Sequence, residues 1–169
     1  MDAQELKARQ APIKDRYRED PSAALVTLRA EGRLGSEQAS CSVDVGRQLV
    51  EAGLHPASGG DGTLACSGDM LLQALVACAG VTLRSVAINR GLEVSGTVTA
   101  KGQLDFRGTL GVDRDAPVGF VSIDLHFALD TAASETEVAA LLRTTERYCV
   151  VYQTLRAATE VGVTSSRVA

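Results

Sequence analysis

The side chains with the most chemical potential in this sequence are its four cysteines. Cys78 lies inside an apolar run, Met70 to Leu83, in which Gln73 and Thr82 are the polar side chains. A buried free cysteine usually packs like a small hydrophobe, whereas an ionised one is a nucleophile. The sequence therefore leaves two interpretations open for Cys78, a packing residue and a thiol held for reaction.

The helical face around Cys78 is not purely apolar. At spacings of three, four and seven residues it shares that face with Leu71, Leu75, Thr82 and Ser85. Two hydroxyl groups beside the thiol favour the reactive interpretation over simple packing.

The remaining cysteines and the two histidines carry weaker signals. Cys41 occupies an inward position of a predicted strand and is expected in the core, while Cys66 and Cys149 are ambiguous by position alone. No CxxC pair occurs, and His55 and His126 show no metal-ligand spacing. We therefore expect neither a disulfide scaffold nor a bound metal.

The elements that must position these residues follow from hydrophobic periodicity and from turn residues. Ser67 is the expected N-cap of the helix that carries Cys78, and Ser134 with Glu137 predicts a capping box. The expected elements are a helix over 2–18, strands over 24–33 and 40–45, a helix over 67–89, strands over 94–106 and 121–129, helices from 134 and 150, and a strand over 160–166. Along 121–129 the inward side chains are Val121, Ile123, Leu125, Phe127 and Leu129. This order predicts an α+β fold with an antiparallel sheet wrapped around a central helix.

Composition limits the class of protein. The chain has 169 residues, 45% hydrophobic and 22% charged, with a formal net charge of −4, which suits one globular domain without affinity for nucleic acid or anionic membranes. The first ten residues are polar, and the 70–83 run is short for a membrane span. We therefore expect a cytoplasmic protein.

Two segments resemble the superfamily of osmotically inducible protein C and organic hydroperoxide resistance proteins. They are GDGTLACSGDMLLQALVACAGVTL, a loop leading into a cysteine-bearing helix, and ERYCVVYQTL, a second cysteine after a later helix. The resemblance covers about residues 24–165. It implies an intertwined homodimer whose antiparallel sheet wraps around a long buried helix, with residues 1–23 as a helical extension of a 24–169 domain. It also implies a thiol-dependent peroxidase of organic hydroperoxides.

Matched by position, the resemblance implies that Cys78 attacks the peroxide and Cys149 resolves the product. The family's catalytic arginine matches Arg33 in "EGR", with Arg29 on the same strand face as the second choice. Gly68 stands where hydroperoxide resistance proteins carry a glutamate, and Asp69 is the adjacent acid. Val150 replaces the proline that often follows the second cysteine. Both departures fit a divergent branch.

The expected chemistry needs an ionised Cys78. A free thiol with a pKa of ~8.5 is only a few per cent ionised at neutral pH. Asp69 lies nine residues earlier, about 13 Å along the axis, so the start of the same helix is too distant to help. We therefore expect the guanidinium of Arg33 to favour the thiolate, with Asp69 orienting it from a partner subunit.

The sequence thus predicts a cytoplasmic, dimeric thiol peroxidase in which Cys78 attacks, Cys149 resolves and Arg33 activates. No metal or bound cofactor is expected, and an external thiol, for example a dihydrolipoyl group, reduces the disulfide. The alternative is a non-catalytic dimer that binds a small apolar ligand between its subunits, with Cys78 as a packing residue.

Overall fold

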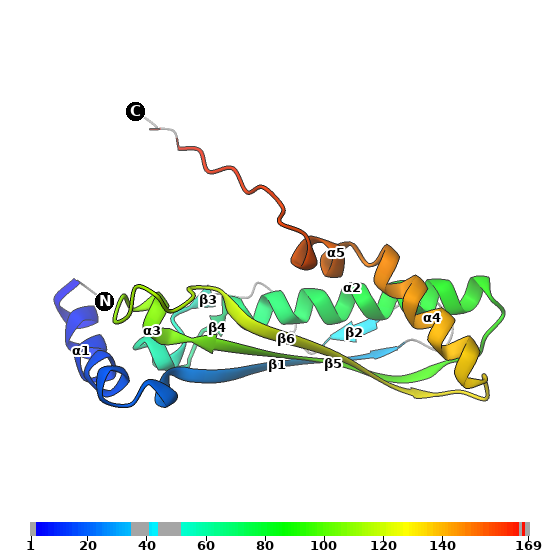
Figure 1. Cartoon of the computed structure of the whole chain (residues 1–169), viewed down its shortest axis with the longest axis horizontal. Coiled ribbons are helices and arrows are strands. Elements are labelled where there is room, and N and C mark those ends of the chain that lie inside the picture. Colours follow the sequence, from blue (N-terminus) through cyan, green and yellow to red (C-terminus); the bar gives the residue numbers. More distant parts are fainter. Residues whose placement is uncertain (1–2, 35–40, 44–51, 166, 168–169) are drawn as a thin grey trace.

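A computed structural model gives the fold of the chain, and it describes residues 3–34, 41–43, 52–165 and 167 (Figure 1). For residues 26–34 and 41–43 the description is of the backbone. The elements in chain order are α1 (Ala3–Glu19), η1 (Pro21–Ala24), β1 (Leu25–Leu34), β2 (Cys41–Val43), β3 (Ala52–Gly53), η2 (Pro56–Ser58), β4 (Ala65–Cys66), α2 (Ser67–Asn89), β5 (Ser95–Asp105), α3 (Phe106–Thr109), β6 (Phe120–Asp130), α4 (Glu135–Tyr148) and α5 (Val150–Arg156). The fold is the predicted mixture of helices and antiparallel strands.

The main sheet has the strand order β2-β1-β5-β6, and each neighbouring pair is antiparallel. β3 and β4 form a separate short parallel pair just before α2. Along β6 the alternation of apolar and polar residues places Ile123, Leu125 and Phe127 half-buried on the inner face and His126 exposed on the other. The pattern of this strand was therefore predicted correctly, with one exception.

The exception is Val121, which was expected on the inner face. The ladder pairs Gln103 with Ser122 and Leu104 with Phe120, so Val121 has no partner opposite it in β5. An unpaired residue of this kind is a β-bulge, which breaks the strict alternation of faces. Val121 is 50% exposed for this reason.

α2 lies along the sheet and forms the core with it, while α4 and α5 pack on α2 from the other side (Figure 1). The main core cluster joins the buried side chains of α2 and β5 to Cys149; its members are Leu72, Leu75, Val76, Ala79, Val98, Ala100 and Cys149. Gly102 has no side chain and so leaves room for the Phe120 ring, because a Cβ at position 102 would lie 2.3 Å from that ring. Burial of these side chains is the main force holding α2 on the sheet.

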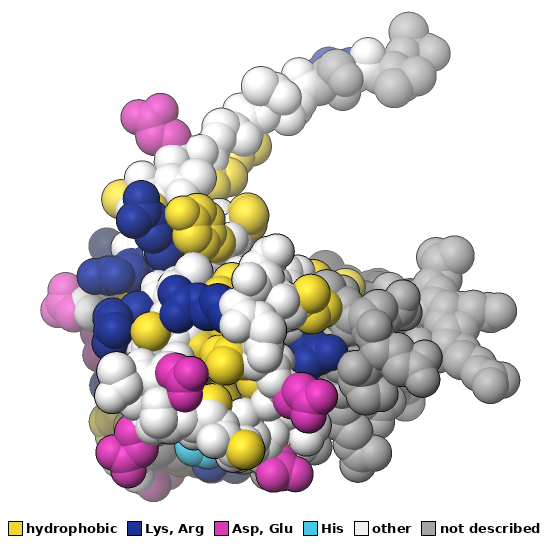
Figure 2. Space-filling view, turned by 90° about the vertical axis from the view of Figure 1, so that its right-hand side faces the viewer, with side chains coloured by type: hydrophobic (Ala, Val, Ile, Leu, Met, Phe, Trp, Pro, Cys, Tyr) yellow, Lys and Arg dark blue, Asp and Glu magenta, His cyan; other side chains and the backbone are white. Residues whose placement is uncertain are grey.

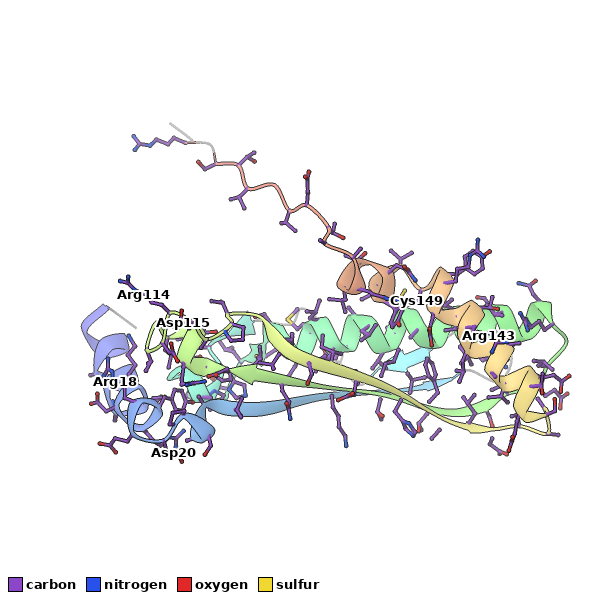
Figure 3. The ribbon with its side chains drawn as sticks, viewed as in Figure 1. Arg18, Asp20, Arg114, Asp115, Arg143 and Cys149 are labelled. Carbon is purple, nitrogen blue, oxygen red and sulfur yellow. The ribbon has the colours of Figure 1, made fainter. Side chains whose placement is uncertain are left out.

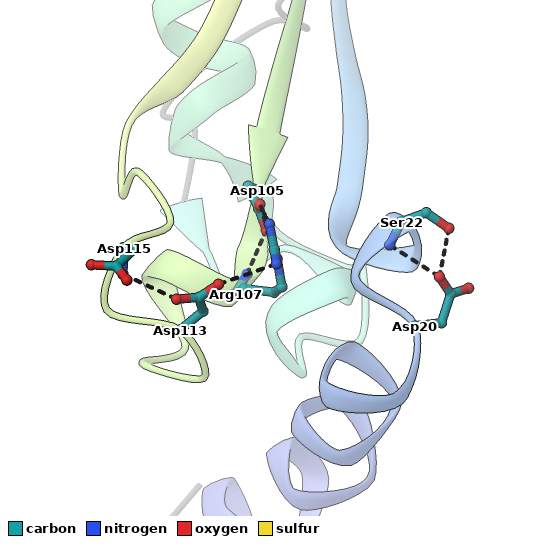
Figure 4. Close-up of polar contacts among 6 residues, drawn as sticks. All are labelled: Asp20, Ser22, Asp105, Arg107, Asp113 and Asp115. Atoms are coloured by element: carbon teal, nitrogen blue, oxygen red, sulfur yellow. Dashed lines mark hydrogen bonds and ion pairs between the residues drawn. The ribbon is translucent and has the colours of Figure 1, made fainter.

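The N-terminal helix is docked on the domain. Tyr17 of α1 is fully buried beside Phe106 and Leu110, and its hydroxyl donates a hydrogen bond to the Ala57 carbonyl at 2.8 Å. The turn after α1 is capped by Asp20, which accepts hydrogen bonds from Ser22 (Figure 4). α1 thus packs against the end of the sheet, and the division of the chain into a 1–23 extension and a 24–169 domain stays a prediction.

A short ionic network closes that end of the sheet. Arg107 contacts the buried carboxylate of Asp105 at 2.5 Å and that of Asp113 at 3.2 Å (Figure 4). Hydrogen bonds from Arg107 hold the pKa of Asp105 below its usual range. The network fixes the α3 turn that supports α1.

The predicted start of α4 is confirmed. Ser134 and Glu137 form a capping box, in which the backbone N–H of Ser134 donates to the Glu137 carboxylate at 2.8 Å. By contrast, α2 begins one residue earlier than expected: Ser67 is its first residue, and Cys66 is the N-cap without a side-chain hydrogen bond.

Two further expectations are corrected by the structure. Residues 159–165 are extended without strand pairing, so the predicted strand over 160–166 is wrong for its described residues. In the described part of the chain the sheet packs along α2, and apolar side chains of α2 such as Val81 and Ile88 are exposed; the wrapping of the sheet around this helix in a dimer stays a prediction. Finally, α2 is long and apolar enough to cross a membrane, although core helices that pack on a sheet, as this one does, meet the same criterion.

Candidate active site

The structure brings Cys78 and Cys149 together at the junction of three helices. Cys78 lies half-buried in the middle of α2 and packs against the core cluster to which Cys149 belongs. Cys149 is 1% exposed and forms the link between α4 and α5, directly over α2 (Figure 3). Residues 71 positions apart in the sequence therefore share one site.

Local backbone geometry explains how Cys149 reaches this position. Cys149 ends α4 in an extended conformation, with φ −71° and ψ 107°, and the same residue is the N-cap of α5. Its sulfur accepts a hydrogen bond from the Tyr152 backbone N–H at 3.5 Å. Upstream, the fully buried Leu141 and Thr145 anchor α4 to α2 and so fix the position of the link.

The environment of Cys78 favours its thiolate. Burial raises the thiol pKa, but hydrogen bonds to the sulfur outweigh this effect and leave the pKa below its ordinary value. The donors are the backbone N–H of Val151, the Cys149 side chain, the backbone N–H of Val150 and the Thr82 side chain. Cys78 is therefore the better nucleophile of the pair.

The environment of Cys149 has the opposite effect. Burial, together with the neighbouring Cys78 sulfur, raises its thiol pKa to about 11, against the opposing hydrogen bonds from the Tyr152 and Val151 N–H groups. Cys149 is thus a protonated thiol at neutral pH, and its S–H group can donate a hydrogen bond to the Cys78 sulfur. A thiol with a lowered pKa beside a thiol with a raised pKa is suited to thiol–disulfide chemistry.

Arg33 and Arg29 lie on β1, whose backbone is described. The register pairs Arg33 with Thr97 of β5, and its neighbour Gly32 with Val98, which belongs to the core cluster around Cys149. Arg29 pairs with Lys101 further along β5. The backbone of Arg33 thus lies next to a strand position that contributes to the core cluster, and the side chains of Arg33 and Arg29 lie outside the described residues. The activating role of Arg33 stays a prediction.

Asp69 lies in the first turn of α2, away from Cys78 of its own chain. Burial raises the pKa of its carboxyl, and the nearby His55 opposes that shift. His55 is held in place because its ring stacks on Phe106 at 5.0 Å and its Nδ1 accepts a hydrogen bond from the Ala57 N–H at 3.0 Å. Within one chain, Asp69 is therefore not part of the site that Cys78 and Cys149 form.

Cys66 and Cys41 lie outside the pair. Cys66 is half-buried at the start of α2 and packs against the main core cluster. Cys41 is paired in register with Leu34 at the end of β1, and its side chain is outside the described residues. The expected core position of Cys41 therefore stays a prediction.

Comparison with known sequences identifies the family. The sequence model of the OsmC-like proteins matches residues 60–164, the segment that contains both Cys78 and Cys149. The chain belongs to the OsmC-like protein family. A comparison with curated protein sequences gives no match.

Solved structures of OsmC-like proteins share this fold. One is an OsmC-like hydroperoxide resistance protein from Jannaschia sp. CCS1, with a TM-score of 0.54 and 13% identity over 82% of this chain and 91% of the other. Another is an OsmC-like protein from Mycoplasma pneumoniae, with a TM-score of 0.53 and 18% identity over 79% of this chain and 86% of the other. At these identities the similarity is one of fold.

Two grooves of this OsmC-like protein flank α2 near the cysteine pair. The larger, about 920 Å³, lies between β6 and the helices, and its α2 wall is made by Leu71 and Leu75, which share the Cys78 face. Tyr152 and Leu155 of α5 form another wall. The smaller, about 450 Å³, runs between α2 and α4 and includes Thr82, Ser85 and Tyr148. Both grooves offer apolar surface within reach of the site.

The donors that α5 presents to Cys78 in this OsmC-like protein were not predicted from the sequence. Because the N-terminus of α2 is distant from Cys78, a guanidinium was expected to favour the thiolate. The Val150 and Val151 N–H groups at the start of α5 provide part of that effect. The sequence held one indication of these donors. Val150 stands where a proline often follows the second cysteine in the superfamily that the sequence resembles, and a proline has no N–H to donate.

Proposed function

We propose that this protein is a cysteine-based peroxidase that reduces organic hydroperoxides through a Cys78–Cys149 disulfide. The observation that supports it best is the contact between two thiols whose pKa values shift in opposite directions, downward at Cys78 and upward at Cys149. A peroxidase of this kind needs an ionised thiol to attack and a protonated one beside it to complete the reaction.

In the first step, the Cys78 thiolate attacks the terminal oxygen of the hydroperoxide. The O–O bond breaks, the remaining oxygen leaves as an alkoxide that takes a proton from water, and Cys78 becomes a sulfenic acid. Arg33 is proposed to favour the thiolate and to hydrogen-bond the leaving oxygen, where charge develops.

In the second step, the Cys149 sulfur attacks the sulfenic sulfur of Cys78. The sulfenic hydroxyl leaves with the Cys149 proton as water, and the disulfide forms. Contact between the two side chains in the reduced protein means that little chain movement is needed for this step. An external thiol, for example a dihydrolipoyl group, then reduces the disulfide and is itself oxidised.

The apolar walls near the site favour an alkyl or acyl hydroperoxide over hydrogen peroxide. Leu71, Leu75 and Leu155 line the larger groove and would contact an apolar substituent. The same groove supports a second candidate function, a non-catalytic dimer that binds a small apolar ligand.

We further propose that the active form is a homodimer in the cytoplasm. α2 exposes Met70, Val81 and Ile88 along its length, and a partner subunit would cover such a stripe. Asp69 cannot reach Cys78 of its own chain, so any action on the site has to come from the partner's copy.

A thiol count distinguishes the two candidate functions. Fully reduced protein is mixed with cumene hydroperoxide and its free thiols are titrated under denaturing conditions. The peroxidase predicts loss of two thiols per chain in the wild type and none in Cys78→Ser. An unchanged count in the wild type favours the ligand-binding alternative.

A further inference from the structure

β6 is an open edge of the main sheet. In the strand order β2-β1-β5-β6 it pairs with β5 on one side, and no described strand pairs with its other side. The strand is 11 residues long and contains neither lysine nor proline, which commonly protect an edge from further pairing. The opposite edge strand, β2, is 3 residues long in the described part of the chain. β6 is therefore the edge that is better able to accept another strand.

The larger groove follows this open edge. Its lining includes every residue from 119 to 127, and opposite them stand leucines of three helices, Leu71, Leu75, Leu142 and Leu155. One wall of the groove is thus a strand with unpaired backbone groups, and the other wall is apolar. A groove of this kind suits an extended segment with apolar side chains at alternate positions.

The C-terminal segment of this chain has that pattern. Residues 159–165 are extended and have no strand pairing in the described structure. Val161 and Val163, two positions apart, lie on the same side of an extended chain and are 83% and 91% exposed. As a strand, seven residues span about 23 Å, which is less than the length of β6. The edge and the segment each have backbone N–H and C=O groups that the other can pair.

The turn after α5 directs this segment away from its own chain. The backbone N–H of Ala157 donates to the Gln153 carbonyl at 2.9 Å, and that of Thr159 donates to the Ala157 carbonyl at 2.8 Å. The Thr159 hydroxyl donates to the Thr154 carbonyl at 3.3 Å. Figure 1 and Figure 2 both show the segment standing clear of the body of the molecule. It is thus placed to meet a second copy of the chain rather than its own β6.

We propose that the C-terminal segment of each chain adds to β6 of a second copy as a further strand of that copy's sheet. The exchange is reciprocal, as a two-fold dimer requires, and the inference rests on the homodimer proposed above. The partner's Val161 and Val163 then close the open side of the larger groove. The helix side, with Leu71, Leu75 and Leu155, stays available to the substituent of a hydroperoxide.

Hydrogen exchange of the unmodified protein, followed residue by residue by NMR, is the first test. A strand paired on one side bonds every second N–H group. Every second amide of residues 160–165 is therefore expected to exchange at least about a hundredfold more slowly than in an unstructured segment. Exchange at the unstructured rate throughout the segment in a dimeric protein would overturn the inference.

The second test identifies the chain that receives the segment. The photoreactive residue p-benzoylphenylalanine replaces Val163, and unlabelled and isotope-labelled chains are refolded together before irradiation. Cross-links are expected to join position 163 of one chain to a peptide containing residues 119–127 of the other, as mass spectrometry of mixed-isotope pairs shows. The same replacement at Glu19, an exposed residue of α1, is the matched control and is expected to give no such link.

The outcomes separate this inference from the proposed function. Links within single chains, or links that avoid residues 119–127, overturn the exchange of segments and leave the peroxidase standing. A monomeric wild type overturns the homodimer and the exchange together. A wild type that consumes no hydroperoxide overturns the peroxidase and leaves the cross-links unchanged. Links between chains, with slow exchange of alternate amides, support the inference. If the Val163 variant does not fold, hydrogen exchange of the unmodified protein decides.

Discussion

The side chain of Cys149 hydrogen-bonds the sulfur of Cys78 across the α2–α5 contact, and the two thiol pKa values move in opposite directions. The relationship is asymmetric because hydrogen bonds, including those from the Val151 and Val150 N–H groups, together outweigh burial at Cys78, whereas burial outweighs the hydrogen bonds at Cys149. The fold thereby gives two chemically identical side chains different roles.

The first prediction is a pH profile. Hydrogen bonding favours the Cys78 thiolate, so the rate of its alkylation by iodoacetamide is expected to reach half of its plateau value below the pH of ~8.5 at which a free cysteine is half ionised. Cys149 stays protonated until the pH approaches about 11. Fragment mass spectrometry across a pH series measures both residues. A Cys78 titration at or above that of free cysteine contradicts the account.

The second prediction concerns Val150. Val150→Pro removes one N–H donor to Cys78 and is expected to raise the Cys78 pKa by up to about one unit. The backbone accepts this change, because proline suits the first residue of a helix and Cys149 already has the extended conformation required before proline. Val150→Ala keeps the N–H and is the matched control. Equal Cys78 pKa values in the two variants would show that this donor is unimportant.

The sequence was sufficient for most of the fold because its elements have strong local signals. The helix α2 ends at Asn89, close to Gly91, and the capping box of Ser134 and Glu137 marks the start of α4. Val121 was placed wrongly because a bulge depends on the register with β5, which one strand does not encode. The prediction of a strand over 160–166 was wrong because a strand needs a neighbouring strand for its backbone hydrogen bonds. Among the described residues, no strand pairs with residues 159–165.

The site was only partly predictable for a related reason. The family resemblance singled out Cys78 and Cys149, and the structure brings them together. The backbone donors of α5 have no side-chain signature, so their effect on Cys78 depends on the tertiary contact between α5 and α2. Thr82 was recognised as polar on the Cys78 face, and it is one of the groups that lower the Cys78 pKa.

The third prediction concerns the arginine. Arg33→Lys keeps the positive charge but loses the planar fork of donors, so turnover of cumene hydroperoxide is expected to fall roughly a hundredfold, with a raised Cys78 pKa. Arg29→Lys is the matched control on the same strand. If Arg33→Lys reacts like the wild type while Arg29→Lys fails, the activating residue is Arg29.

The fourth prediction concerns assembly. The C-terminal segment extends away from the body of the chain, with Val161 and Val163 83% and 91% exposed (Figure 1). Together with the exposed apolar side chains of α2, it is expected to be covered in a homodimer that has no stable folded monomer. Sedimentation at micromolar concentration measures this directly, and a double variant, Val161→Asp with Val163→Asp, is expected to weaken the dimer. A compact, folded wild-type monomer would contradict the prediction.

The most direct test of the central claim is the intact mass of each protein after treatment with one equivalent of cumene hydroperoxide. The account predicts that the wild type loses two hydrogens and that fragment mapping places the disulfide between Cys78 and Cys149. Cys149→Ser is expected to gain one oxygen atom at Cys78 with the first equivalent, and a second one when a further equivalent is added, because its sulfenic acid has no thiol partner and passes on to sulfinic acid. Cys41→Ser and Cys66→Ser are expected to behave like the wild type. Oxygen gain in the wild type, or a disulfide that maps to Cys66, would contradict the proposed pair.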